Sequence, residues 1–182
     1  MDLNAISLDV ALANLASAFS SIQQLLVAIS YVSGIYFVYR GIGMYRIFAN
    51  QTMGSAQRGE FAGPLVFIVV GAILIYLPST VDTSMQSLYG SSEVAGATDF
   101  LAYSSVAKDE RWAQLTDVLM KYMKLIGLIA FIRGWFILSK LGNSGSQPGS
   151  MGKGVTHIIG GVLLMNIVET MNILAQTFGF AR

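Results

Sequence analysis

The stretch that decides the fold is FAGPLVFIVVGAILIYLPSTVDTSMQSLYG, residues 61–90. Its first 21 residues, 61–81, carry no charged side chain. As an α-helix, which rises about 1.5 Å per residue, they would measure about 31 Å and match a hydrocarbon core of about 30 Å. Pro64 suits the first turn of such a helix, and Pro78 suits a break at its other end. We therefore expect a membrane-spanning helix that ends in a kink.

Two amphipathic segments accompany the apolar runs. After Pro78, a narrow apolar stripe is formed by Val81, Met85, Leu88 and Tyr89. A second stripe leads into the first apolar run and consists of Leu8, Leu12, Leu15, Phe19 and Ile22. Stripes of this kind predict helices that lie along the membrane surface.

The layout of residues 61–90 recurs near the C-terminus in NIVETMNILAQTFG, residues 166–179. Matching Arg40-Gly41 to Arg133-Gly134 gives an offset of 93 residues, and matching Tyr89-Gly90 to Phe178-Gly179 gives 89. We interpret the pattern as two tandem copies of one helical hairpin, inserted with the same orientation as a parallel internal repeat. Chance similarity between apolar segments is the alternative.

Composition places the chain in the membrane class. Hydrophobic residues make up 54% of the 182 residues and charged residues 12%, and the mean hydropathy is +0.61. A soluble domain of this size needs more polar surface. The net charge of +1 comes without a large basic patch, so we expect no direct nucleic-acid binding. The absence of cysteine excludes disulfides, thiolate metal sites and cysteine nucleophiles.

The expected fold is an all-α integral membrane protein with four transmembrane helices in a single membrane domain, residues 1–182. The predicted spans are residues 22–39, 61–81, 115–138 and 154–167. Residues 22–90 form the first hairpin repeat and residues 115–180 the second. Basic loops are predicted at residues 40–59 and 140–153, and a polar connector at residues 91–114.

Charge distribution predicts the orientation. Both hairpin loops are basic, whereas the connector is acidic, so the positive-inside rule places the loops in the cytoplasm and both termini outside. Lys121 and Lys124 count against this topology because they lie at the end of the third span that would face outside. The residues expected at the cytoplasmic boundary are Arg40, Arg46, Arg58, Arg133, Lys140 and Lys153.

Few residues suggest chemistry. Glu169 is expected at the outer interface, in a structural contact with Lys124 or Lys121 between the third and fourth helices. His157 has no second histidine, cysteine or acid at ligand spacing. We therefore predict no catalytic, cofactor or metal site, and we expect Gly71, Gly160 and Gly161 to permit close helix packing.

The combination of an amphipathic N-terminus, basic Gly/Ser-rich hairpin loops and second helices that end in LYG and TFG resembles a known family. It is similar to the IcmC/DotE-like small inner-membrane proteins of type IVB (Dot/Icm, IncI-type conjugation) secretion systems. Each hairpin also looks like the pilin subunits of type IV secretion systems. The resemblance implies a non-enzymatic structural subunit that packs against membrane lipids, other secretion-system subunits and itself. It also implies a bacterial inner membrane, in which the outer side, with both termini and the connector at residues 91–114, would be the periplasm. It offers no catalytic residues and no cofactor.

Two other functions stay open. A small transporter or channel would need polar residues at the bilayer midplane, and residues 65–76 of the second span offer none. A pilin-like filament subunit would have the same hairpins, and the sequence does not separate it from a subunit that stays in the membrane.

Overall fold

The computed structural model describes residues 8–51, 62–90, 110–143 and 148–179, and their regular secondary structure is helical throughout. This confirms the expected all-α class for the described residues. The elements in chain order are α1 (Leu8–Gln51), α2 (Ala62–Ile75), α3 (Leu77–Tyr89), α4 (Glu110–Ser139), the short 3₁₀-helix η2 (Lys140–Gly142), α5 (Ser150–Met165) and α6 (Ile167–Thr177).

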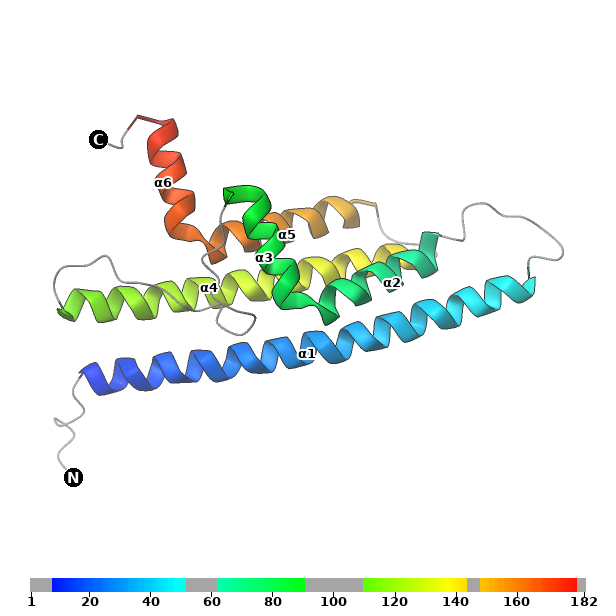
Figure 1. The fold of residues 1–182 in the computed structure, drawn as a ribbon, viewed down its shortest axis with the longest axis horizontal. Coiled ribbons are helices and arrows are strands. Elements are labelled where there is room, and N and C mark those ends of the chain that lie inside the picture. Colours follow the sequence, from blue (N-terminus) through cyan, green and yellow to red (C-terminus); the bar gives the residue numbers. More distant parts are fainter. Residues whose placement is uncertain (1–7, 52–61, 91–109, 144–147, 180–182) are drawn as a thin grey trace, which may run out of the picture.

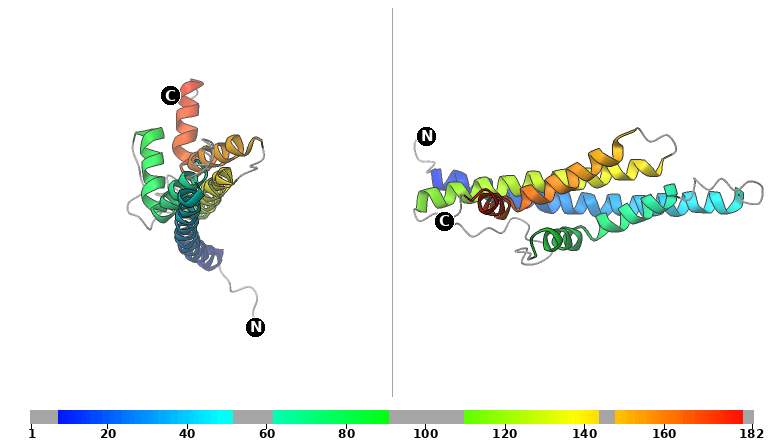
Figure 2. Two further views of the ribbon diagram at one scale, coloured as in Figure 1. Left: turned by 90° about the vertical axis from the view of Figure 1, so that its right-hand side faces the viewer. Right: turned by 90° about the horizontal axis from the view of Figure 1, so that it is seen from above.

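The helices pair as two hairpins. Helix α2 packs along α1 to form the first hairpin, and α5 packs along α4 to form the second (Figure 1). Seen from above, the two hairpins lie side by side (Figure 2). Helices α3 and α6 leave their hairpins at bends of 91° and 92°. By length and composition, two helices could cross a membrane, or up to four if each bent pair counts as one span.

Helix α1 is longer than predicted. The expected surface segment, the first span and the start of the first basic loop form one continuous helix of 44 residues. The first proline of the chain is Pro64, so nothing comparable interrupts α1. Arg40 and Arg46 therefore lie on a helix and not in a loop. At about 1.5 Å per residue, α1 measures about 66 Å, about twice the thickness of a hydrocarbon core.

The sequence predicts one helix of 21 residues for the second span, but the straight helix found there, α2, has 14 residues. Helix α2 ends at Ile75, and the bend lies at Tyr76, whose φ and ψ are −96° and 33°. Pro78 occupies the first turn of α3, where its missing N–H is tolerated, so the break comes two residues before the proline. Helices α5 and α6 bend in the same way at Asn166 without a proline.

A threonine four residues after each bend caps the broken end. The Thr80 Oγ1 lies 3.3 Å from the carbonyl oxygen of Ile73 and 3.1 Å from that of Tyr76. The Thr170 Oγ1 has the corresponding contacts, at 2.9 Å and 2.8 Å, to Leu163 and Asn166. Thr80 and Thr170 are 90 residues apart, so the two bent segments align with an offset of 90 residues. Glu169 therefore corresponds to Ser79. The offset of 89 taken from the sequence would have matched it to Thr80.

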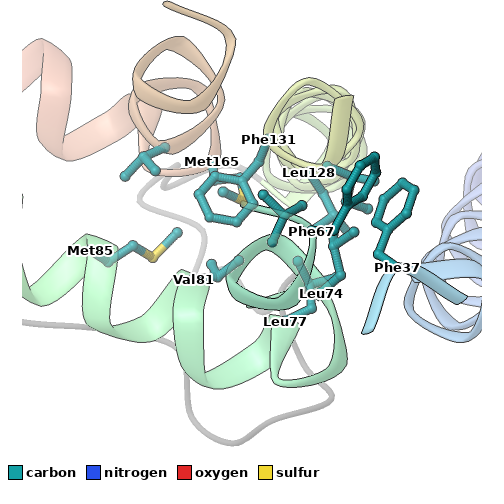
Figure 3. Packing of buried hydrophobic residues seen from close by; sticks show 12 residues of the cluster. Phe37, Phe67, Leu74, Leu77, Val81, Met85, Leu128, Phe131 and Met165 are labelled. Atoms are coloured by element: carbon teal, nitrogen blue, oxygen red, sulfur yellow. The ribbon is translucent and has the colours of Figure 1, made fainter. Parts of the chain in front are cut away.

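The core lies between the two hairpins and is centred on the first bent pair (Figure 3). Helix α3 points Leu77, Val81 and Met85 into it, and α4 contributes Leu128 and Phe131. Helix α6, by contrast, has no buried residue. The two bent segments thus have different surroundings although their bends are alike.

Candidate functional site

Close glycine contacts hold each hairpin together. A Cβ atom added at Gly34 would lie 2.7 Å from the carbonyl oxygen of Gly71, and one at Gly127 would lie 2.8 Å from that of Gly161. Only glycine allows the backbones of α1 and α2, or of α4 and α5, to approach this closely. Gly71 and Gly161 therefore lie at helix contacts. Gly160 faces open space, with nothing within 4 Å of an added Cβ atom.

The second hairpin is displaced along the helix axis relative to the first. Gly34 and Gly127 occupy the same place in their hairpins and are 93 residues apart. Phe37, however, packs against Phe136, 99 residues further on, with ring centroids 5.4 Å apart. The difference of six residues corresponds to about 9 Å along a helix. Arg133 therefore lies about 9 Å along α4 from the level of Arg40, towards the middle of the bundle.

A cavity of about 820 Å³ lies between the hairpins near their loop ends. Its charged lining residues are Arg40 from α1, Arg133 from α4, Lys140 from η2 and Lys153 from α5. No carboxylate is among the described residues that line it. The rest of the wall consists of apolar and aromatic side chains, among them Val32, Phe37, Phe67, Phe136 and Ile137, and of the polar residues Ser33, Ser139 and Asn143. The cavity is thus cationic at some points and apolar at others.

Arg40 connects the two hairpins through this cavity. Its Nη2 donates a hydrogen bond of 2.9 Å to the Asn143 Oδ1, beyond η2. Its guanidinium carbon also lies 4.8 Å from the centroid of the Phe67 ring on α2, at cation–π distance. Although the sequence suggests a side chain that extends to the membrane boundary, Arg40 is fixed by partners from both hairpins. Asn143 carries no sequence signal for this role because the contact spans 103 residues.

The four cavity cations lack acidic partners within the described part of the chain. Arg40 bonds to an amide, and Arg133, Lys140 and Lys153 form no ion pair with a described carboxylate. Lys121 differs, since its Nζ lies 2.8 Å from the Asp117 Oδ2 one turn earlier on α4. The cavity therefore concentrates positive charge that the described residues do not neutralise.

The other predicted residues lie apart from the cavity. Arg46 is exposed on α1, and Arg58 lies outside the described residues. Glu169 is exposed in the first turn of α6, so its contact with Lys124 stays a prediction. The His157 Nδ1 lies 2.8 Å from the carbonyl oxygen of Lys153, within its own helix.

The described residues contain no group of three or more histidine, cysteine or acidic side chains that could hold a metal ion. Comparison with protein-family models, curated proteins and solved structures finds no match. The chemistry available at this site is the binding of an anion that also carries an apolar part.

Proposed function

We infer that this protein is a non-enzymatic structural subunit of a membrane-bound machine and that it assembles laterally through its helical hairpins. The interface between the two hairpins is the observation behind this inference, because a hairpin of another chain could pack against this protein in the same way. The setting, a type IVB secretion or conjugation machine of a bacterial inner membrane, rests on the sequence resemblance alone.

The proposal treats the chain as two tandem copies of one hairpin unit. Equal bends of 91° and 92° support this, as do the matching glycine contacts at Gly34–Gly71 and Gly127–Gly161. The paired contacts of Thr80 and Thr170 add a third correspondence. The bend with its threonine contacts, and the glycine contact between the paired helices, thus recur at the same places in both halves.

Differences in burial between matching positions support a lateral partner. On α4, Leu125 and Leu128 are 5% and 0% exposed, because they pack against the first hairpin. Of the two matching residues of α1, Val32 lines the cavity between the hairpins, whereas Ile35, which corresponds to Leu128, is 48% exposed. The position of Ile35 in the first hairpin is therefore uncovered, whereas the matching position in the second hairpin, Leu128, is covered.

The opposite end of the chain has the complementary free face. On α3, Val81 is fully buried against the second hairpin, whereas the matching residue of α6, Met171, is 57% exposed. A partner that packed on α6 as α5 packs on α3 would cover it. Other machine subunits and a further copy of this chain are the partners we propose.

The displacement between the hairpins favours a pilin-like filament subunit as the second candidate. When an interface joins two different faces of the same subunit, added copies form an open filament unless the rotation between neighbours closes them into a ring. Because each step between hairpins also advances by about 9 Å along the axis, copies that repeated it would form a helix and would leave the plane of a flat bilayer.

Affinity purification from native membranes tests the proposal. We expect the tagged protein to co-purify in a large complex, and we expect its deletion to abolish secretion or DNA transfer. Liposomes that contain the purified protein alone should stay impermeable to ions and small solutes. Flux through such liposomes would contradict the structural role and support the channel alternative.

A further inference from the structure

We propose that the cavity between the hairpins binds the phosphate of an anionic phospholipid, with Arg40, Arg133, Lys140 and Lys153 as the cationic groups around it. The proposal rests on the membrane location that the proposed function assumes. It is independent of which machine the protein serves.

Charge is the first argument. Four cationic residues line one open cavity of about 820 Å³ whose described lining contains no carboxylate. All four are exposed on the protein itself, so in a bilayer they would face lipid, where an unpaired charge in the low-dielectric region is costly. Since Arg133 lies about 9 Å along α4 from the level of Arg40, towards the middle of the bundle, the need for a counter-ion is greatest there. An external anion supplies the missing partner.

The geometry of Arg40 is the second argument. One of its nitrogens donates to Asn143, and its guanidinium plane is held near the Phe67 ring. A guanidinium group has five N–H donors in a fixed arrangement that matches phosphate oxygens. With its orientation set by these two contacts, Arg40 keeps donors free and loses little side-chain entropy when it binds a phosphate.

The apolar wall identifies the source of the phosphate. Val32, Phe37, Phe136 and Ile137 line the same cavity as the cations. A free phosphate would use the cations and leave this wall empty, whereas the acyl chains of a phospholipid would cover it. Basic pockets between membrane helices recognise anionic headgroups in this way. The shared chemistry is a phosphate group, and the amphipathic lining favours the lipid.

Native mass spectrometry of the purified full chain tests this site, with phosphatidylglycerol and phosphatidylcholine as probes in equal amounts. We expect selective retention of phosphatidylglycerol, and a loss of about fivefold in its affinity for each cation removed by Arg133→Gln, Lys140→Gln or Lys153→Gln. Arg46→Gln is the matched control, because Arg46 is an exposed cation of α1 outside the cavity. It should leave retention unchanged.

Two further measurements keep the result interpretable. Arg133→Lys keeps the charge and should retain most of the binding, and helicity by circular dichroism should be equal in all variants. Equal retention of both lipids, or an equal loss in Arg46→Gln, would overturn the site. Displacement of phosphatidylglycerol by millimolar inorganic phosphate would overturn the lipid assignment in favour of a soluble anion. Co-purification of the large complex is a separate readout, so failure here is distinguishable from failure of the proposed function.

Discussion

Phe37 of α1 and Phe136 of α4 pack edge to face, with ring centroids 5.4 Å apart and an interplanar angle of 66°. This contact fixes the level at which the second hairpin lies against the first. Together with the contact between Phe19 and Tyr122, at 5.8 Å, it places Lys121 and Lys124 beside residues 18–25 of α1. The predicted first span begins at residue 22, so the two lysines lie level with its N-terminal end.

The first prediction concerns this ring contact. Phe37→Ala and Phe136→Ala should each lower the free energy of unfolding, because Phe37 is buried and Phe136 packs against the core. In a double-mutant cycle the two changes should couple by about 0.5–1.5 kcal/mol, the typical value for an aromatic pair. Unfolding of the detergent-solubilised protein by sodium dodecyl sulfate would measure this coupling.

Tyr39→Ala provides the control for that cycle. Tyr39 lies on the same helix but is 77% exposed, so it should show no coupling to Phe136. Coupling of the same size for both pairs would mean that α1 responds as a whole and that the ring contact has no special role.

The second prediction concerns the glycines between paired helices. Gly34→Ala and Gly127→Ala would place a methyl group 2.7–2.8 Å from the backbone of the facing helix. The helices must then separate, and we expect a loss of about 1–3 kcal/mol in stability for each change. Gly43→Ala and Gly160→Ala are matched controls, since nothing lies within 4 Å of an added Cβ atom at either position.

These controls should be neutral or stabilising, because alanine favours a helix over glycine by about 1 kcal/mol. Thermal unfolding in one detergent would rank the four variants. If Gly160→Ala destabilised the protein as much as Gly127→Ala, helix contact would not explain either effect.

The helical class follows from the sequence because hydropathy and helix periodicity are local properties. The bend between α2 and α3 is equally local, since Pro78 and the polar residues after it mark the region. The continuity of α1 through Arg40 and Arg46 does not follow, because charged residues at a membrane boundary are compatible with both a loop and a helix. The cavity could not be predicted at all, since Arg40 meets Asn143 only through the displacement between hairpins. That displacement depends on side-chain packing between segments far apart in the chain.

The third prediction concerns the threonines at the bends. Thr80→Val and Thr170→Val keep the shape of the side chain but remove the hydroxyl that contacts one carbonyl oxygen of α2 or α5 and one of the bend residue, Tyr76 or Asn166. We expect each to cost about 1 kcal/mol. Thr170→Val should cost more than Thr80→Val, because the Thr170 Oγ1 also lies 2.7 Å from the Tyr89 hydroxyl at the end of α3.

Thr83→Val is the comparison for these changes. Its hydroxyl donates only to the Ser79 carbonyl oxygen within the same helix, at 2.8 Å, and at an exposed position. A cost for Thr83→Val equal to that for Thr170→Val, measured by the same unfolding assay, would show that the bends do not depend on these hydroxyl groups.

The fourth prediction tests assembly between copies. If a second copy packs on this chain as the second hairpin packs on the first, the contact between Phe37 and Phe136 has an equivalent between the two chains. Its members are Ala130 of one copy, 93 residues after Phe37, and Gly43 of the next copy, 93 residues before Phe136. Because the chain has no cysteine, Ala130→Cys and Gly43→Cys can be placed in differently tagged copies without a background. A short thiol-reactive crosslinker should join the two tags in native membranes, whereas either variant alone should give no homodimer, because the interface joins different faces. Crosslinking of Ala130→Cys to itself would indicate a symmetric dimer, and products that contain only other proteins would restrict lateral assembly to different subunits.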